Sequence, residues 1–226
     1  MLPPIPNKLL QIDETTVGQH FLLNSTDVCY HIWEYTRRGG FRASPTNQLI
    51  FNLKKKPSRL LANPREAPWK ENAIAYCAQA MQRMMNRKWI EGYATLVPVP
   101  SSKIIGHPDH DDRLLRVLQK AFTGSKADIR PLLVQSHSTA ADHETPDRQR
   151  FEELLAVTRI DEAIIGAGVR HQIMVFDDVL NSGKHFKIAQ HLLRQRFPET
   201  SIVGVFLARC LPDPPVEFDL VPDAQS

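Results

Sequence analysis

The stretch His171–Leu193, HQIMVFDDVLNSGKHFKIAQHLL, constrains the fold of this chain more than any other. It begins with a short apolar run, passes two adjacent aspartates and a polar turn with one glycine, and continues with apolar residues at helical spacing. A short apolar run that leads into an amphipathic helix is typical of a strand–turn–helix unit in a parallel sheet. We therefore expect a strand over His171–Phe176, with both acids just past its end, and a helix over His185–Phe197.

Strands and helices alternate in this way from about residue 90 onward. Further strands are predicted at Tyr93–Lys103, Ile129–Gln135 and Ser201–Ala208, and further helices at Asp111–Phe122 and through Phe151, Leu154 and Leu155. The alternation indicates an α/β fold with a parallel, twisted sheet flanked by helices on both faces. Ligands of such sheets bind at the carboxyl ends of the strands, so the residues that directly follow each strand are the candidate site.

The first 90 residues show a different pattern. We expect an irregular arm over 1–26, a strand at Cys29–Thr36, a strand or a short helix capped by Ser44 or Thr46 within Ser44–Ser58, a surface connection over Pro57–Glu71, and a helix over Asn72–Trp89. The expected organisation is an N-terminal extension or hood over 1–90 with a strand pair and a helix, a core over 91–210, and a proline-rich tail over 211–226.

The composition of the chain limits its setting and its partners. Hydrophobic residues make up 42% of 226 residues, which is enough for a full core, and 28 basic against 25 acidic residues do not favour a nucleic-acid or membrane surface. The basic pairs and runs at Arg37–Arg38 and Lys54–Lys56 are interpreted as solvated surface, with nucleic acid left open. Three scattered cysteines without a CxxC pair argue against a zinc site or a disulfide framework. Without a signal-like N-terminus or a long apolar run, we expect a cytoplasmic protein with no membrane segment.

The acidic pair and the turn after it suggest a ligand site. Asp177 and Asp178 are suited to accept hydrogen bonds from a vicinal diol or to hold a hydrated magnesium ion. The turn opens a helix, whose backbone N–H groups and dipole favour an anion, and Gly183 permits close approach of the backbone. Three other interpretations stay open: a receiver-type acidic pair, a P-loop despite the missing spacing around Gly183, and a metal cluster in HPDHDD (His107–Asp112).

Here the sequence resembles a known family. IMVFDDVLNSGKH (Ile173–His185) looks like the phosphoribosyl-pyrophosphate (PRPP) signature of type I phosphoribosyltransferases. TLVPVPSSK (Thr95–Lys103) and NQLIFNLKKKP (Asn47–Pro57) are similar to segments of the ComF-like branch of that superfamily, and the three segments stand in the expected order. The resemblance covers roughly residues 45–210.

The resemblance implies roles for the matching residues. Asp177 and Asp178 would contact the ribose hydroxyls directly or through Mg²⁺, and Ser136–Arg150 would form a lid to which Arg148 or Arg150 adds positive charge. The implied 5′-phosphate loop is Asn181, Ser182, Gly183, Lys184 and His185, and the implied pyrophosphate loop is Ser101, Ser102 and Lys103. The implied activity is transfer of a phosphoribosyl group to an unidentified acceptor with release of pyrophosphate.

The chain departs from the family pattern at three points. His185 stands where the signature usually closes with threonine, HPDHDD stands near the place of an Arg-Gly-Phe-Asn-Gln stretch, and the cysteine-rich zinc module of the ComF-like branch is absent. These departures leave open a second class of function, a non-catalytic PRPP or nucleotide sensor, or an interaction module in a DNA-uptake or phage-defence type of system. A homodimer also stays open, and no residue identifies a general base.

Overall fold

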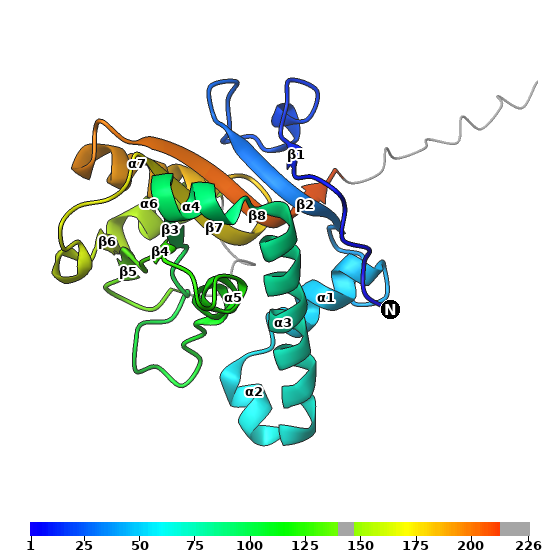
Figure 1. The fold of residues 1–226 in the computed structure, drawn as a ribbon. Coiled ribbons are helices and arrows are strands. Elements are labelled where there is room, and N and C mark those ends of the chain that lie inside the picture. The colour runs from blue at the N-terminus through cyan, green and yellow to red at the C-terminus, as the bar shows by residue number, and fades with distance from the viewer. Residues whose placement is uncertain (140–146, 213–226) are drawn as a thin grey trace, which may run out of the picture.

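A six-stranded sheet with the strand order β1-β2-β8-β7-β3-β4 forms the centre of the protein (Figure 1). The computed structural model describes residues 1–139 and 147–212, without the side chains of 147–150. All neighbours in this sheet pair in parallel except β1, which is antiparallel to β2. The α/β class with a flanked sheet is confirmed, and the sheet is mixed rather than purely parallel.

The strands and helices have the following bounds. The strands of the main sheet are β1 (Leu10–Gln11), β2 (Cys29–Thr36), β3 (Ala94–Pro98), β4 (Asp128–Ile129), β7 (Gln172–Leu180) and β8 (Ser201–Leu211), and β5 (Leu133–Gln135) pairs antiparallel with β6 (Thr158–Ile160). The helices are α1 (Pro45–Leu53), α2 (Pro57–Ala62), α3 (Ala67–Met84), α4 (Arg87–Tyr93), α5 (Arg113–Ala121), α6 (Asp147–Val157) and α7 (Lys184–Arg196). Short 3₁₀ turns lie at Val17–Gln19, Pro64–Glu66 and Glu162–Ile164.

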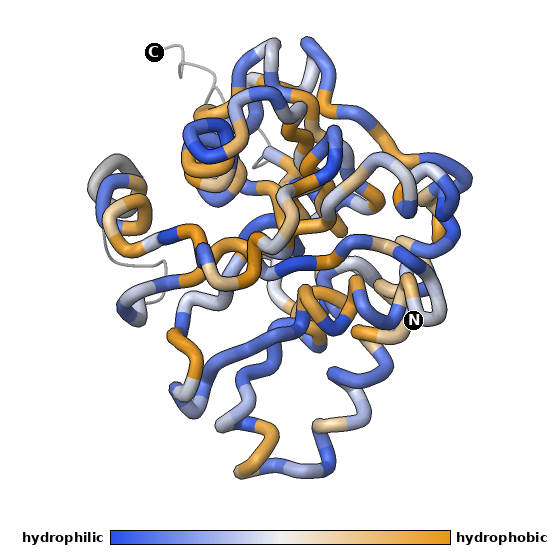
Figure 2. Tube along the Cα trace, turned by 60° about the vertical axis from the view of Figure 1, so that its left-hand side comes forward, coloured by the Kyte–Doolittle hydropathy of each residue, from blue (hydrophilic) through white to orange (hydrophobic). Residues whose placement is uncertain are grey.

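The alternation of side chains along β7 divides the core into two layers. Met174 and Phe176 pack on one face of the sheet in a cluster with α1, α3 and α5, whereas Ile173 and Val175 pack on the other face in a cluster with α7. Both clusters are buried, which explains why this strand reads as a continuous apolar run. Figure 2 shows the apolar stretches gathered towards the interior of the trace, with hydrophilic stretches in the outer loops.

The chain reverses its direction across the sheet between β3 and β7. After β3 it passes through α5 to β4 on one side, and after β7 it passes through α7 to β8 on the other side. β3 ends at Pro98 opposite Phe176, and β7 continues to Leu180 beside β8. The sequence had predicted the two aspartates just beyond the end of this strand, but they lie inside β7. They do lie beyond the end of the neighbouring strand β3. A crevice at such a switch point is the usual ligand site of α/β sheets.

The N-terminal residues contribute directly to this sheet. The predicted strand Cys29–Thr36 is confirmed as β2 and pairs in parallel with β8, and the helix within Ser44–Ser58 is α1, capped by the Ser44 side chain. The surface connection predicted over Pro57–Glu71 is wrong, because α2, a 3₁₀ turn and the start of α3 occupy it. A proline stands in the first turn of each of these three segments, where its missing N–H costs no hydrogen bond.

Two further predictions needed correction, and two segments lie outside the described residues. The strand predicted over Ile129–Gln135 is split into β4 and β5, which belong to different sheets. The helix predicted over Asn72–Trp89 ends at Met84, and a second helix, α4, follows with Asn86 as its cap. Residues 140–146 of the predicted lid and 213–226 of the predicted tail lie outside the described residues, as do the side chains of Arg148 and Arg150.

No helix in the described ranges combines the length and the apolar character that a membrane span requires.

The N-terminal arm is fixed against α7 and against the turn that precedes it. The buried Asp27 carboxylate accepts from Lys187 Nζ at 2.9 and 3.0 Å and from Gln190 Nε2 at 3.0 Å. The Leu22 N–H donates to the Ser182 carbonyl at 3.0 Å. Burial by itself raises the pKa of Asp27, but the hydrogen bonds from Asn24 N–H, Lys187 and Gln190 outweigh it and hold this pKa below its ordinary value.

We expect Asp27→Asn to lower the free energy of unfolding by about 1–3 kcal/mol near pH 7, because Lys187 loses its charged acceptor. Since the folded-state pKa of Asp27 is depressed, its stabilisation is present above the unfolded pKa and is lost as the pH falls through the folded one. The difference between the variant and the wild type should therefore shrink below about pH 4. Urea unfolding from pH 3 to 7 measures it, with the exposed Glu199→Gln as control. A difference that does not change with pH would contradict this role of Asp27.

Candidate functional site

Two adjoining cavities meet at the acidic pair. The first, here the Ser101-side cavity, has a volume of about 250 Å³ and reaches Ser101, Ser102 and Arg113. The second, here the Arg37-side cavity, has a volume of about 670 Å³ and reaches Tyr35, Arg37, Arg38 and Phe51. Residues common to both linings are Lys54, Asp177, Asp178, Lys184 and His185. The acidic pair Asp177–Asp178, which was predicted to bind a diol or magnesium, thus lies at the junction of the two cavities.

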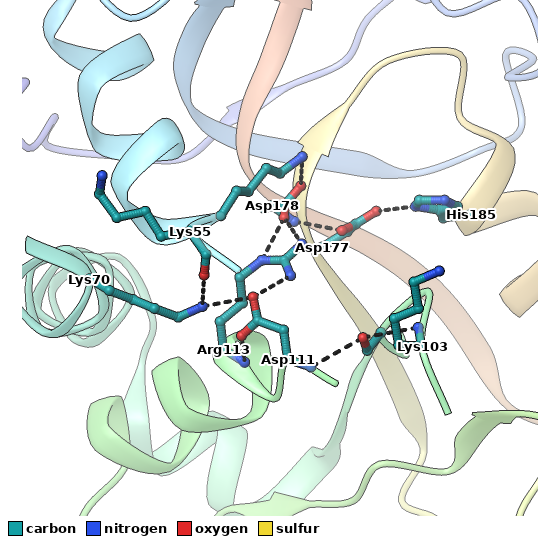
Figure 3. A network of polar contacts seen from close by, with 10 residues as sticks. Lys55, Lys70, Lys103, Asp111, Arg113, Asp177, Asp178 and His185 are labelled. Atoms are coloured by element: carbon teal, nitrogen blue, oxygen red, sulfur yellow. Dashed lines mark hydrogen bonds and ion pairs between the residues drawn. The ribbon is translucent and has the colours of Figure 1, made fainter. Parts of the chain in front are cut away.

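Asp178 is neutralised by two cations from the α1/α3/α5 face of the sheet. Its Oδ1 is 2.8 Å from Lys54 Nζ, and its Oδ2 accepts from Arg113 Nη2 at 2.6 Å and from Arg113 Nε at 3.1 Å (Figure 3). The carboxylate is buried. Burial alone raises the pKa of Asp178, but Lys54 and Arg113 outweigh it and hold this pKa well below its usual range. Asp178 is therefore a carboxylate at any pH near neutrality.

Arg113 links Asp178 to a further group of buried charges, Asp111 and Lys70. Arg113 Nη1 also donates to Asp111 Oδ2 at 3.0 Å, and Lys70 Nζ donates to the same oxygen at 2.8 Å and to the Lys55 carbonyl at 2.7 Å (Figure 3). Burial is the main cause that lowers the pKa of Lys70, although Asp111 opposes it. The network ties α1, α3 and α5 to β7, so the positions of Lys54 and Arg113 depend on the packing of three helices.

Asp177 faces the opposite side of the sheet and has different partners. Its Oδ2 lies 2.9 Å from His185 Nδ1, and its Oδ1 accepts from the Asp178 N–H at 2.7 Å. The Asp177 side chain is buried, whereas 42% of the His185 side chain is exposed. His185 therefore orients one carboxylate oxygen from the start of α7 while it remains open to the cavities. This contact gives His185 a definite position beside Asp177.

The turn Asn181–His185 brings the N-terminus of α7 to the cavity edge. Gly183 is the N-cap residue and has a φ of +88°, in the left-handed region that favours glycine. A Cβ built on it would lie 2.7 Å from Leu23 Cδ2, so the arm also approaches the turn too closely for a side chain. The His20 Nδ1–H donates to the Asn181 carbonyl, which adds a second contact between arm and turn. The positive end of the helix dipole is thus held in a fixed place beside Asp177.

The predicted pyrophosphate loop is only partly turned towards the cavity. Ser101 and Ser102 line the Ser101-side cavity, and Ser101 Oγ accepts from the N–H groups of Lys103 and Asp111, both at 3.2 Å. Lys103 is not part of that lining, and its Nζ donates to the Thr139 carbonyl at 2.8 Å. The structure therefore brings Ser101 and Ser102 to the acidic pair, while Lys103 holds the start of the 136–150 segment.

Two cations at the site were not predicted from the sequence. Lys54 had been interpreted as solvated surface, and Arg113 lies in the helix that follows HPDHDD. Lys54 lies at the end of the segment Asn47–Pro57, and Arg113 directly follows HPDHDD, so both stood beside stretches that the sequence had singled out. In the described part of the chain no three His, Cys, Asp or Glu residues gather in a metal-binding group, so HPDHDD forms no metal cluster there.

A magnesium ion held by both aspartates does not fit the arrangement of the site. Both oxygens of Asp178 are in contact with cations, and Asp177 Oδ2 is in contact with His185. A metal shared by the pair would have to displace Lys54 or Arg113 and would lie beside the other positive charge. Magnesium therefore remains a prediction from the family resemblance.

Comparisons with known proteins do not assign the chain to a family. No family model matches it, and no curated protein matches it.

We expect Gly183→Ala to cost more free energy of unfolding than Gly106→Ala. Both residues have a φ near +90°, which costs an alanine about 1–2 kcal/mol, but a Cβ at Gly106 would meet nothing within 4 Å. The excess at Gly183 should disappear in a Leu23→Ala background, because the clash is with the Leu23 side chain. Urea unfolding of the four variants tests this, and an equal cost at the two glycines would contradict the close contact of arm and turn.

Asp178→Asn should destabilise the protein by about 3–5 kcal/mol, since it leaves Lys54 and Arg113 beside a neutral amide. Asp177→Asn should cost only about 1 kcal/mol, because its partners are a backbone N–H and a half-exposed histidine. Because the pKa of Asp178 lies well below its usual range, the penalty for Asp178→Asn should persist down to about pH 4. Thermal or urea unfolding compares the two variants, and similar losses for both would refute their unequal electrostatic roles.

Proposed function

We propose that this protein binds PRPP or a related phosphorylated ribose and transfers the phosphoribosyl group to an acceptor, with release of pyrophosphate. One observation carries the proposal: at the switch point of the sheet, an acidic pair is followed directly by a glycine turn that opens α7, and it faces the Ser101–Ser102 loop across a cavity. A diol, a phosphate and a second phosphate group each find a suitable partner in this layout.

In this proposal the two ends of the ligand use different parts of the site. The 5′-phosphate binds at the turn Asn181–His185, where backbone N–H groups and the helix dipole favour an anion. The ribose hydroxyls bind at Asp177, whose carboxylate lies at the junction of both cavities. The pyrophosphate extends into the Ser101-side cavity, which Lys54 and Arg113 also line.

Lys54 and Arg113 give this cavity the charge that a pyrophosphate requires. Without ligand they pair with Asp178, and a bound pyrophosphate competes for the same guanidinium and ammonium donors. The fork of Arg113 suits a phosphate bidentately, whereas Lys54 acts as a point charge on a flexible stem. Asp178 then serves to hold the two cations in place rather than to bind the sugar alone.

The transfer itself breaks the bond between the anomeric carbon and the pyrophosphate oxygen and forms a bond from the acceptor to that carbon. The bonding pair leaves with the pyrophosphate, and the acceptor loses a proton if it was protonated. The sugar passes through an oxocarbenium-like state with positive charge, which the Asp177 carboxylate stabilises. Positioning and electrostatics carry this type of reaction. Magnesium, bound to the pyrophosphate of the ligand, would add neutralising charge to the leaving group.

A second candidate function is supported by a specific observation. His185 replaces the usual threonine and holds Asp177, while Lys54 and Arg113 hold Asp178. Both carboxylates of the acidic pair are thus in contact with a partner before any ligand arrives, which also suits a protein that binds PRPP without turning it over. This sensor would report ligand binding through the release of those ion pairs.

Calorimetry with PRPP, with and without Mg²⁺, followed by a pyrophosphate-release assay over a set of acceptors, separates the two functions. We expect binding in the micromolar range and release of pyrophosphate with at least one acceptor. Binding without release favours the sensor. No binding by folded protein contradicts both functions.

Asp177→Asn is the sharpest single change for this test, because its expected cost in stability is small. It should weaken PRPP binding at least tenfold, since the diol loses its charged acceptor. Asp112→Asn, at the exposed start of α5, is the matched control and should bind like the wild type. Unchanged affinity in a folded Asp177→Asn variant would refute the placement of the ribose.

A further inference from the structure

We infer that the outer part of the Arg37-side cavity is the acceptor site, and that it takes a planar aromatic ring that carries a carboxylate. This inference rests on the proposed function, since it names the class of acceptor for the same site. It is carried by the residues that line this cavity beyond the acidic pair and the turn, which are Tyr35, Arg37, Arg38, Gly40 and Phe51. The proposed PRPP site uses none of these residues.

The direction of the reaction places the acceptor in this cavity. The two cavities meet at Lys54, Asp177 and Asp178, so a ribose held at the pair has one side towards each of them. If the pyrophosphate leaves into the Ser101-side cavity, a nucleophile that displaces it in line must approach from the opposite side. That side is the Arg37-side cavity, whose volume of about 670 Å³ is in the usual range for small-molecule sites.

Aromatic side chains form the wall that a planar ring would contact. Phe51, on α1, lies on the cavity with 42% of its surface exposed and packs edge-on against Phe41 at a ring distance of 6.1 Å. Phe41 itself is 45% exposed, and Tyr35 lines the cavity from the end of β2. Aromatic faces of this kind offer a large apolar contact for a second ring. Phe51 and Tyr35, which line the cavity, therefore favour an aromatic ligand over an aliphatic one.

Arginines of the turn between β2 and α1 supply the charge. The basic residues that line the cavity are Arg37, Arg38, Lys54 and Lys184. Its acidic lining residues are Asp177 and Asp178. Asp178 is already paired with Lys54 and Arg113, so the lining favours an anion. A guanidinium matches a carboxylate bidentately and also stacks on aromatic rings, which suits a ligand that has both groups.

The backbone of this turn supports a functional interpretation. Arg38 has a φ of +57°, and in the described ranges it is the one residue other than glycine in that region. This conformation costs an arginine about 1–2 kcal/mol. A glycine could adopt it without that cost, and the two glycines Gly39 and Gly40 follow directly in the sequence. Strained residues of this kind cluster at ligand sites. The left-handed residue thus lies in a turn that places two consecutive arginines on the cavity.

Matched pairs of probes test the inference by calorimetry in the presence of ribose 5-phosphate. The pairs are pyridine-3-carboxylate against pyridine-3-carboxamide and 2-aminobenzoate against aniline. We expect at least one acid to bind tenfold or more tightly than its neutral partner. Arg37→Gln should remove that preference while PRPP affinity stays within about twofold, and Phe51→Ser should weaken the acid and its partner alike. Arg42→Gln, an exposed change just beyond the same turn, is the control and should leave both affinities unchanged.

The outcomes separate this inference from the proposed function. PRPP binding without any preference for the acids, or a preference that survives Arg37→Gln, overturns the acceptor site and leaves the proposed function intact. Acid binding that depends on Arg37 in a protein that does not bind PRPP overturns the acceptor role together with the proposed function. Tight binding of a short single-stranded oligonucleotide that competes with the acids and depends on Phe51 overturns the inference in favour of a nucleic-acid surface.

Discussion

The site depends on the alternation of side chains along β7. Because successive residues of a strand point to opposite faces, two adjacent aspartates cannot share an environment. Asp178 follows the register of Met174 and Phe176 and meets Lys54 and Arg113 on the α1/α3/α5 face, whereas Asp177 follows that of Val175 and meets His185 from α7. β3 ends before the pair, which opens both carboxylates to the crevice of the switch point. The two acids of this strand therefore have different roles. Asp178 holds two cations in place, and Asp177 lies at the junction of the cavities.

Much of this arrangement was predictable from local pattern. The alternation of apolar runs and amphipathic helices predicted the α/β class, and the turn around Gly183 predicted the opening of α7, because both signals lie within short windows of the sequence. The prolines between Pro57 and Pro68 were misinterpreted as a connection, since a first-turn proline and a loop proline look alike without their partners. The end of β7 was also placed too early, because charged residues inside a strand break the apolar signal that marks it.

The partners of the acids were not predictable in the same way. Lys54 and Arg113 are 124 and 65 residues away from Asp178 along the chain, and their meeting depends on how α1 and α5 pack on the sheet. Local sequence contains no measure of that packing, so Lys54 reads as surface and Arg113 as an ordinary helix residue. The same limit applies to Arg37 and Phe51. Nothing in their local sequence indicates a cavity, and only the fold places both of them on one. Long-range ion pairs are the part of the site that required the structure.

We expect the turn Asn181–His185 to bind a sugar phosphate beside Asp177. A crystal structure of the protein with ribose 5-phosphate tests it most directly. The phosphate should lie within hydrogen-bond distance of the backbone N–H groups of the turn, with ribose hydroxyls on the Asp177 carboxylate and the anomeric carbon towards the junction of the two cavities. A phosphate bound at Arg37 or Lys103, with the turn and Asp177 unchanged and without ligand contact, would contradict it.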